Sequence, residues 1–579
     1  MRILGVDVGG TFTDAVLLAD GEVRTAKVPT AARQEQSVLE AARAVGAGEV
    51  DRFTHGTTVA TNALLERKGA RTAFVATAGF EHLLHLRRQT RAHLYRLCAA
   101  HPEPLVPLER CIGVRERAGP DGVLVALDLG SLPELDADAV AVCLLHSYRH
   151  PEHERAVAEE LRRRLPHAHV VASHEIAPEF REYERASTAA ADAYLGPVTS
   201  GYLRALASAA EGAGLPEPFV MRSSGGVATV DEAAEHPAIV LVSGPAGGAV
   251  GAARVAAAEG FPDAIAFDMG GTSTDVCLIA GGVAGRTSER VVAGLPIRLP
   301  TIDIHTVGAG GGSIARVDAG GAVRVGPESA GAEPGPACYG RGGVLPTVTD
   351  ANLLLGRLPP RLAGGVALDR EAAKQAFGTL DPAAVVEIVN AEMLRALRVV
   401  SVERGHDPAD FALVAFGGAG PLHACALAEE LGIRTVLVPE AAGVLSALGL
   451  VASDERRDRV ESRLVPLADA GELPRDGEAD LRYAGQSFEL TIPLQPDLTA
   501  AFHAAHEARY GYADHGREIE LVAVRTADVR PGPRFELPCA DPLRVEGPSV
   551  LEQPGSTVWI PPGWVGVRDG SSTLRVTRA

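Results

Sequence analysis

Two stretches of the chain share one pattern of apolar and polar positions. Residues 264–280, AIAFDMGGTSTDVCLIA, contain an apolar run, an Asp, a Gly-Gly-Thr turn, a second Asp and another apolar run, and residues 1–18, MRILGVDVGGTFTDAVLL, follow the same order. Each stretch predicts a β-hairpin with a tight glycine turn. One such hairpin is a weak signal, because Asp-x-Gly-Gly also fits an ordinary turn, but two copies indicate a duplicated site.

The chemistry of the two turns is suited to phosphate. Glycine can adopt a positive φ and lets backbone N–H groups approach an anion without a Cβ in the way. The neighbouring Thr and Ser residues add hydroxyl donors. Asp268, just before its turn, and its counterpart Asp7 are therefore expected to help place a Mg²⁺ ion.

Around the hairpins, segments typical of strands alternate with segments typical of helices. Residues 139–146 predict a buried strand, 151–165 a helix and 170–173 another strand, and 184–213 predict a long helix. Such alternation indicates an α/β fold.

Three further segments are rich in small residues. Residues 243–253, SGPAGGAVGAA, open a predicted helix, and their spacing fits either a close crossing of two helices or a ligand loop. Residues 411–430 predict a strand, a glycine turn and a helix, an order common at nucleotide sites but weak evidence alone. The Gly- and Pro-rich residues 306–343 are interspersed with apolar residues, which favours an ordered loop against a ligand.

The character of the chain changes after Asp454. Residues 455–480 are polar and predict irregular structure, whereas 488–493, 518–530 and 556–560 predict strands. A length of 579 residues suggests several domains. We therefore expect an N-terminal domain at 1–185 with the first hairpin, a second domain at 186–454 with the second hairpin and the glycine turn of residues 411–430, and a β-rich domain at 455–579.

Composition narrows the class of protein. A net charge of −19 argues against general nucleic-acid binding. No apolar run is long enough for a membrane helix and no signal-peptide pattern is present, so we expect no membrane association and a cytoplasmic location. The seven cysteines are scattered without a C-x-x-C, which predicts neither a disulfide framework nor a Cys-type zinc site; they are Cys98, Cys111, Cys143, Cys277, Cys338, Cys425 and Cys539. Cys277 and Cys425 lie in apolar patterns and are expected to be buried.

Two polar segments have more than one interpretation. The threonines of residues 53–65, FTHGTTVATNALL, could cap a helix or present hydroxyls to a ligand. Residues 79–96 are rich in Arg and His, so they could bind an anionic substrate, face an acidic partner or form a solvated helix face.

The order of these motifs resembles the actin-like ATPase superfamily, in which two related α/β domains clasp ATP·Mg²⁺. Within it, strings such as DVGGTFTD, THGTTVATNALLERKG, SHEIAPEFREYERAST, FDMGGTSTDV and AFGGAGPLHA are similar to the hydantoinase A / 5-oxoprolinase / acetone carboxylase β-subunit family. The resemblance implies two actin-like (ribonuclease H-like) ATPase domains around a nucleotide cleft, with inserted α/β segments and a smaller β-rich C-terminal domain.

The same resemblance implies an activity. Family members use ATP to phosphorylate an amide or enolate oxygen, so this chain is expected to activate a hydantoin, 5-oxoproline or related lactam for opening by water. Two alternatives stay open: a subunit of a ketone carboxylase, and a nucleotide-switched regulatory or chaperone-like ATPase. Because the chain ends at residue 579 without a B-type region, a separate hydantoinase B-like subunit is expected, and a homo-oligomer is left open.

The family pattern assigns roles to residues of this chain. Asp7 and Asp268 would act in catalysis and hold Mg²⁺, whereas Asp14 and Asp275 are expected to be structural. The ATP-binding residues implied are Gly9, Gly10, Thr11, Thr13, Gly270, Gly271, Thr272 and Thr274 for phosphate, and Gly417, Gly418 and Gly420 for adenosine. The substrate-side candidates are His55, Thr57, Thr58, Arg88, Gln89, Glu179, Arg181, Glu182 and Glu333.

Three positions depart from the family pattern. Arg87 stands where a glycine is usual, Ala92 where a proline is usual, and Arg222 where a glutamine is usual. We expect substrate choice to be made near these positions, so the resemblance does not fix which cyclic amide or ketone is used.

Overall fold

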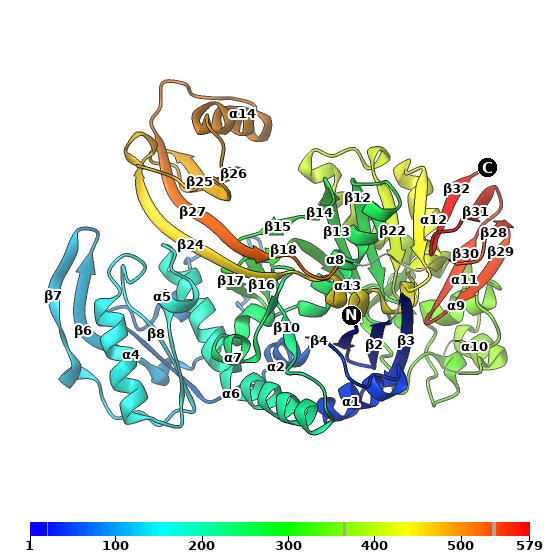
Figure 1. Ribbon diagram of the computed structural model, residues 1–579, viewed down its shortest axis with the longest axis horizontal. Coiled ribbons are helices and arrows are strands. Elements are labelled where there is room, and N and C mark those ends of the chain that lie inside the picture. Colours follow the sequence, from blue (N-terminus) through cyan, green and yellow to red (C-terminus); the bar gives the residue numbers. More distant parts are fainter. Residues whose placement is uncertain (20, 363–365, 535–539) are drawn as a thin grey trace.

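A computed structural model describes residues 1–19, 21–362, 366–534 and 540–579. Helices and strands alternate along most of the chain, and the strands of the described residues form two large sheets, a five-stranded sheet and four two-stranded sheets (Figure 1). Cys277 and Cys425 are buried as predicted, whereas Cys539 lies outside the described residues.

The first large sheet begins with the predicted N-terminal hairpin. β1 (Ile3–Val8) pairs antiparallel with β2 (Phe12–Ala19), which pairs with β3 (Glu22–Pro29). On its other side β1 is parallel to β4 (Arg52–Gly56), and β4 is parallel to β10 (Phe219–Met221). Helix α1 (Gln34–Ala44) packs on this sheet through Val38, Ala41 and Ala42.

The second large sheet repeats this arrangement. β12 (Ala264–Met269) pairs antiparallel with β13 (Thr274–Ala280), which pairs with β14 (Val283–Ala284). On its other side β12 is parallel to β22 (Ala412–Phe416), followed by β23 (Thr435–Pro439). The predicted duplication therefore extends from the hairpins to strand order and direction.

Two small-residue helices cross between the sheets. In α8 (Ser243–Ala258), a Cβ on Gly247 would lie 2.9 Å from the carbonyl oxygen of Ser446 in α13 (Leu445–Ala452). Helix α13 also lies against β1, where a Cβ on Gly5 would meet the Ala447 carbonyl oxygen at 2.5 Å. The structure thus shows the close helix crossing that the small residues of 243–253 allow.

A smaller α/β unit is inserted after the first hairpin, at the left of Figure 1. Its sheet has the order β7 (Gly122–Asp128), β6 (Cys111–Gly119), β5 (Thr72–Thr77), β8 (Ala139–Cys143) and β9 (His169–Ala172). Helix α4 (Glu152–Arg164) packs on it, and the long helix α6 (Glu182–Gly212) packs on β8 and runs on toward α1.

Strands after residue 455 extend both large sheets. β24 (Glu455–Pro466) lies between β11 (Val227–Ala228) and β27 (Ile519–Arg530), and β25 (Glu478–Tyr483) and β26 (Leu490–Pro493) follow. β32 (Thr573–Arg578) pairs with β23, and β31 (Trp564–Arg568) and β28 (Leu543–Glu546) follow. The prediction of irregular structure was wrong for 455–466, because pairing with β27 along its length holds this charged segment extended, with β11 added only at Glu455.

The remaining helices lie around these sheets. They are α2 (Val59–Leu65), α3 (Leu83–Leu86), α5 (Ser173–Ile176), α7 (Val230–Glu235), α9 (Val348–Leu354), α10 (Arg370–Phe377), α11 (Pro382–Val400), α12 (Gly420–Leu431) and α14 (Leu498–Tyr510). The remaining strands are short: β15 (Arg286–Thr287), β16 (Arg290–Val292), β17 (Leu295–Ile297), β18 (Thr301–Ile302), β19 (Ile304–Val307), β20 (Ser313–Val317), β21 (Val323–Ser329), β29 (Ser549–Gln553) and β30 (Ser556–Ile560).

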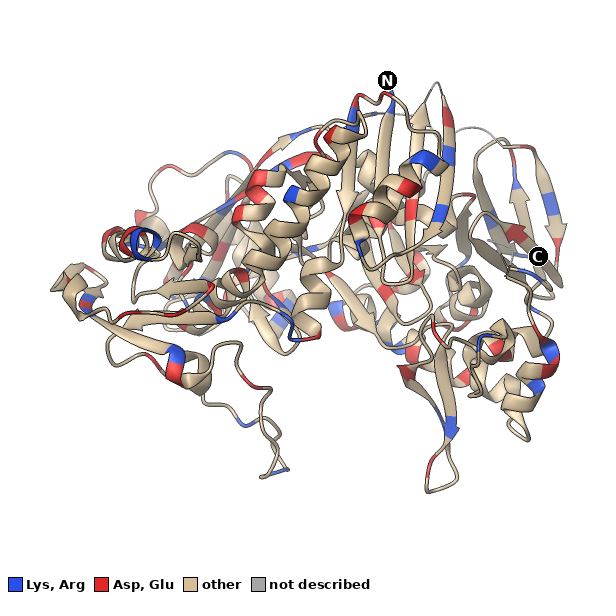
Figure 2. Cartoon of the chain, turned by 90° about the horizontal axis from the view of Figure 1, so that it is seen from below, with Lys and Arg blue, Asp and Glu red and all other residues tan. Residues whose placement is uncertain are grey.

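The surface mixes charges of both signs. Acidic and basic residues are interspersed over helices and strands on the face seen in Figure 2. Within the described ranges, no helix is long and apolar enough to cross a membrane.

Candidate functional site

Asp7 and Asp268 occupy equivalent places near the ends of β1 and β12, where they lie opposite Asp14 and Asp275. Burial, followed by the charge of Asp14, raises the pKa of Asp7 to about 7. Burial, followed by the charges of Asp275 and Asp7, raises the pKa of Asp268 to about 8. Because the charge of Asp7 acts on Asp268, the two hairpins face one another, and we call this pair the two-aspartate site.

Glycines let the backbone approach both carboxylates. A Cβ on Gly56, at the end of β4, would overlap Oδ1 of Asp7, and a Cβ on Gly417, after β22, would overlap Oδ1 of Asp268. Gly417 has a φ of +78°, which favours glycine. A Cβ on Gly244, in the first turn of α8, would lie 3.5 Å from both Asp7 carboxylate oxygens. The positive end of the α8 dipole therefore faces Asp7.

The two turns divide their backbone donors in the same way. The Gly9 N–H donates to the Phe12 carbonyl at 2.9 Å, and the Gly270 N–H donates to the Ser273 carbonyl at 3.1 Å. These two amides close the turns, so they are not free for phosphate. In the part of the chain that the structure describes, four exposed residues of the turns have N–H groups that donate no hydrogen bond: Gly10, Thr11, Gly271 and Thr272.

Thr13 and Thr274 are fully buried, and their hydroxyls contact protein rather than the open turn. Thr13 Oγ1 lies 3.0 Å from Thr30 Oγ1, and Thr274 Oγ1 donates to the Ala309 carbonyl at 2.6 Å. The structure therefore gives these two predicted phosphate ligands a role in anchoring the hairpins.

Asp14 and Asp275 hold the neighbouring strands. Asp14 forms an ion pair with Lys27 of β3, and Asp275 accepts a hydrogen bond from Thr306 of β19 at 2.5 Å. Both carboxylates have a raised pKa, mainly because they are buried. These contacts agree with the structural role expected for the second Asp of each hairpin.

Lys27 is a functional candidate that the sequence did not reveal. Its charge lowers the pKa of both Asp7 and Asp268 against the larger effect of burial. A Cβ on Gly555 would lie 3.3 Å from Lys27 Cε, so this side chain reaches from the first sheet to the turn between β29 and β30. The alternation of polar and apolar residues in EVRTAKVP did not indicate that this edge strand lies next to the second half of the chain.

Two glycine loops complete the surroundings of Asp268. Gly417 donates to the Ala442 carbonyl at 2.9 Å, Gly418 is exposed, and Gly420 begins α12. In the other loop, the N–H groups of Gly311 and Gly312 donate to the Gly270 and Gly271 carbonyls at 3.0 and 2.7 Å. This part of the Gly-rich segment 306–343 is ordered, and it packs against the turn of the second hairpin.

The donor set at the two aspartates fits Mg²⁺. Oδ1 of Asp7 is buried and has no hydrogen-bond partner within the described residues. No group of three or more His, Cys, Asp or Glu side chains in those ranges could hold a metal. Mg²⁺ is commonly bound by one or two carboxylates together with waters and substrate phosphates, so two facing aspartates are sufficient.

The segment His55 to Thr58 lies beside Asp7. His55 is buried, with Nδ1 3.1 Å from the Val6 carbonyl oxygen and Nε2 2.8 Å from the Tyr202 hydroxyl. Burial lowers its pKa to about 4, so the ring is neutral at pH 7. The Thr57 N–H donates to Ser243 Oγ at 3.3 Å, and Thr58 Oγ1 accepts from Asn62 at 3.4 Å. Thr57 joins the first sheet to the start of α8.

Glu179 and Arg181 belong to a buried ionic cluster. We use this name for seven residues from distant parts of the chain: Glu179, Arg181, Glu289, Arg298, Asp480, Glu489 and Arg525. Glu179 accepts hydrogen bonds from Arg298 at 2.8 Å and from Arg525 at 2.6 Å. Arg181 pairs with Glu489 at 2.7 Å.

Of the other substrate-side candidates, Arg88 lies close enough to the ionic cluster for the charges of Glu289 and Arg298 to act on it. Arg88 donates to Glu184 at 2.5 Å, and Glu182 lies 3.9 Å from Arg185. Gln89 and Glu333 are exposed. The three candidates of the His55 segment flank Gly56, which is the strand partner of Asp7.

Comparisons with known proteins add to this geometry. The profile of the hydantoinase/oxoprolinase N-terminal region matches residues 3–165, and the hydantoinase/oxoprolinase profile matches residues 185–459. The alpha subunit of caprolactamase from Pseudomonas jessenii is 33% identical over 99% of both sequences. 5-Oxoprolinase 1 from Arabidopsis thaliana is 36% identical over 79% of this chain and 42% of its own length.

Two solved structures are similar over 100% of both chains. ATP-dependent caprolactamase from Pseudomonas jessenii has a TM-score of 0.87 at 31% identity. Nucleotide-free acetone carboxylase has a TM-score of 0.80 at 24% identity, which supports a common fold alone. The multi-domain α/β fold predicted from the sequence is confirmed.

Proposed function

Because this chain belongs to the hydantoinase/oxoprolinase family, we propose that it is the ATP-dependent subunit of an enzyme that opens a cyclic amide. The reaction proposed is phosphorylation of the amide oxygen of a hydantoin, 5-oxoproline or related lactam, followed by attack of water on the ring carbon. Similarity to a caprolactamase subunit and to a 5-oxoprolinase supports a lactam as the substrate class.

The two-aspartate site supplies the groups that phosphoryl transfer requires. Asp7 and Asp268 would hold Mg²⁺, which neutralises charge on the phosphates when it is bound. The free N–H groups of Gly10 and Gly271 point from two turns and are suited to donate to phosphate oxygens. Lys27 adds a positive charge between the two halves of the site.

Phosphorylation of the amide oxygen has a chemical purpose. An unstrained amide is a poor electrophile because its nitrogen donates electron density to the carbonyl. Transfer of a phosphoryl group to the oxygen withdraws that density, so that water can add to the ring carbon. The ring C–N bond then breaks with the nitrogen leaving as an amine, and hydrolysis of the resulting acyl phosphate by a second water releases the acid and phosphate. The proposal includes a separate hydantoinase B-like subunit that completes ring opening. Similarity to the alpha subunit of caprolactamase supports a partner subunit.

One observation carries the proposal: two copies of one hairpin place Asp7 close enough to Asp268 for its charge to act on that carboxyl. The test is phosphate release from MgATP by the chain together with its B-like subunit, in the presence of caprolactam, 5-oxoproline or hydantoin. Stimulation by at least one cyclic amide, with formation of the ring-opened acid, is expected.

Two further assays separate the alternatives. A ketone carboxylase would release phosphate only when both bicarbonate and a ketone are present. A nucleotide-switched regulatory ATPase would hydrolyse ATP at a rate that no lactam or ketone changes. Either result would replace the proposed activity.

A further inference from the structure

The loop after α3 exposes large apolar side chains. Among residues 87–101, which we call the basic–apolar loop, Leu94, Tyr95 and Leu97 are 70%, 90% and 88% exposed. Single exposed apolar residues are ordinary, but three within four positions form a patch, and such patches mark interaction sites.

The charge of this loop is opposite to that of the whole chain. Residues 82–102 contain four arginines and no Asp or Glu, in a chain with a net charge of −19. Arg87 donates to the Pro102 carbonyl and Arg88 pairs with Glu184. Across the described ranges, no ion pair joins Arg91 or Arg96 to an acidic side chain. Two unpaired arginines therefore flank the exposed Leu94 and Tyr95, and Arg and Tyr are enriched in protein interfaces.

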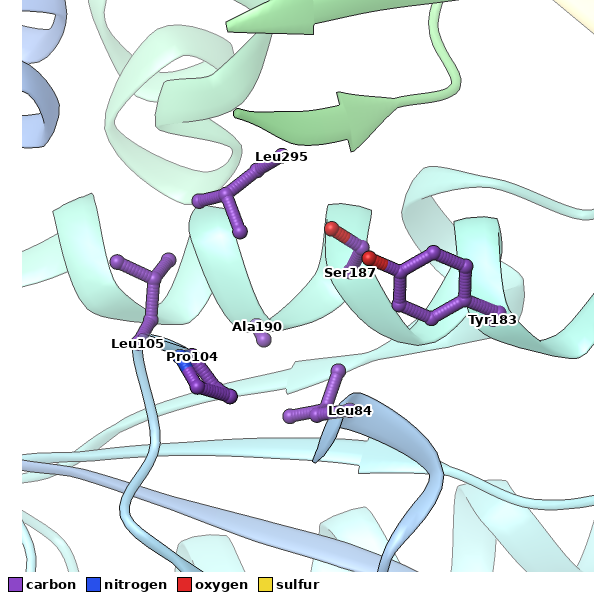
Figure 3. A pocket seen from close by; sticks show the side chains of 7 residues that line it. All are labelled: Leu84, Pro104, Leu105, Tyr183, Ser187, Ala190 and Leu295. Carbon is purple, nitrogen blue, oxygen red and sulfur yellow. The ribbon is translucent and has the colours of Figure 1, made fainter. Parts of the chain in front are cut away.

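A small apolar hollow lies at the base of the loop. It is lined by Leu84 from α3, Pro104 and Leu105 from the chain after the loop, Tyr183, Ser187 and Ala190 from α6, and Leu295 from β17 (Figure 3). Its volume of about 10 Å³ gives room for about one water molecule, so a lactam ring does not fit. This hollow therefore gives the loop no substrate pocket at its base.

We propose that the basic–apolar loop is the docking surface for the partner subunit, whose facing surface presents acidic side chains around an apolar centre. The inference rests on the separate subunit of the proposed function. A second copy of this chain is a poorer match, because a two-fold symmetric contact through the loop would place Arg91 and Arg96 near their own copies.

The experiment measures binding of the purified hydantoinase B-like subunit from the same organism to the full chain by sedimentation velocity. One variant combines Leu94→Ser, Tyr95→Ser and Leu97→Ser, and a second combines Arg91→Glu and Arg96→Glu. Each should raise Kd by at least about 10-fold. Between about 50 mM and about 300 mM salt, the affinity of the wild type should fall more steeply than that of the Arg variant.

A matched control changes an exposed leucine on another element. Leu124→Ser on β7, where Leu124 is 71% exposed, should leave Kd unchanged. All variants should keep the increase in Tm produced by MgATP, because the loop is separate from the two-aspartate site. This readout distinguishes loss of docking from loss of folding.

Several results would overturn the proposal. They are an unchanged Kd in both loop variants, loss of binding only in Leu124→Ser, self-association of the chain that the loop variants abolish, or no binding of the B-like subunit to the wild-type chain. Failure of the proposed function looks different, because the complex would then assemble normally but no cyclic amide would stimulate phosphate release.

Discussion

The two-aspartate site and the ionic cluster both bury carboxylates, but the carboxylates differ in whether a cation is paired with them. Asp7 and Asp268 have pKa values raised to about 7 and about 8, chiefly by burial, and Oδ1 of Asp7 has no hydrogen-bond partner within the described residues. Glu179 instead accepts from Arg298 and Arg525 at 2.8 and 2.6 Å. A buried carboxylate left without a partner is costly, so it marks a place for a bound cation, whereas a paired one joins segments.

Asp268→Asn tests the first half of this comparison and should have the largest effect. Loss of the carboxylate should lower lactam-stimulated phosphate release by about 10³-fold, typical for removing one preorganised electrostatic contact. Because burial already disfavours the charged form of Asp268, the free energy of unfolding should stay the same or rise. Steady-state kinetics and urea denaturation on one preparation measure both quantities.

Asp7→Asn should behave in the same way, since the two residues occupy equivalent positions in the two sheets. Asp121→Asn, at an exposed position, is the control and should change neither quantity. Near-normal turnover in Asp268→Asn would remove the two-aspartate site from the mechanism.

Glu179→Gln tests the second half. Removing one partner from a buried ion pair should lower the free energy of unfolding by about 3 kcal/mol, because Arg298 and Arg525 keep their charges in a buried place. The kcat of the folded protein should change little. Glu22→Gln, which breaks the exposed pair with Arg24, should cost less than about 1 kcal/mol.

The opposite result for Glu179→Gln would also be informative. Full stability combined with loss of lactam stimulation would mean that Glu179 acts on the substrate, as the family resemblance implied. The ionic cluster would then belong to the reaction rather than to the joining of distant segments.

Lys27→Ala sharpens the comparison within the two-aspartate site, because Lys27 pairs directly with Asp14 of the first hairpin, whereas Asp275 of the second accepts from Thr306, to which Arg290 donates. Loss of this charge should raise the KM for ATP by about 10-fold, equivalent to about 1.4 kcal/mol, with a smaller change in kcat. Asp14→Asn is the control, since it breaks the ion pair with Lys27 but keeps the cation. Equal effects of the two substitutions would show that Lys27 acts only by holding Asp14.

The same contrast explains what could be predicted from the sequence. The hairpins, the helix crossing and the glycine turn after β22 were predictable because each depends on a local run of glycines and apolar residues. Lys27 and the ionic cluster were not, since their neighbours come from distant segments: Glu179 and Arg525 are 346 positions apart. Residues 455–466 were mispredicted for the same reason, because β27, from a distant part of the chain, pairs with that charged segment and holds it extended.

Within the turns, the sequence identified the right segments but not the role of each atom. Gly9, Thr13 and their counterparts Gly270 and Thr274 have the residue types that phosphate sites use. In the structure, the glycine N–H groups form hydrogen bonds within the turns, and the threonine hydroxyls contact neighbouring segments. Which donor of a Gly-Gly-Thr turn stays free depends on backbone geometry, which residue type alone does not determine.

The smallest expected effect concerns Glu489 and the pH dependence of stability. Burial raises its pKa, but the hydrogen bond from Arg181 and the charges of Arg181 and Arg298 outweigh burial, so the pKa lies below its ordinary 4.5. A depressed carboxyl pKa contributes stability that is present above pH 4.5 and is lost as the pH falls through the folded-state pKa. The difference in free energy of unfolding between wild type and Glu489→Gln should therefore be constant above about pH 5 and shrink below it. Urea denaturation from about pH 3.5 to about pH 6, without nucleotide and with EDTA, measures this difference.

The contribution of Asp268 has the opposite sign, because its raised pKa makes its stability contribution fall as the pH rises toward about 8. A difference for Glu489→Gln that instead grew on acidification would mean that Glu489 is not held as a charged partner, and the contrast between paired and unpaired carboxylates would fail at this residue.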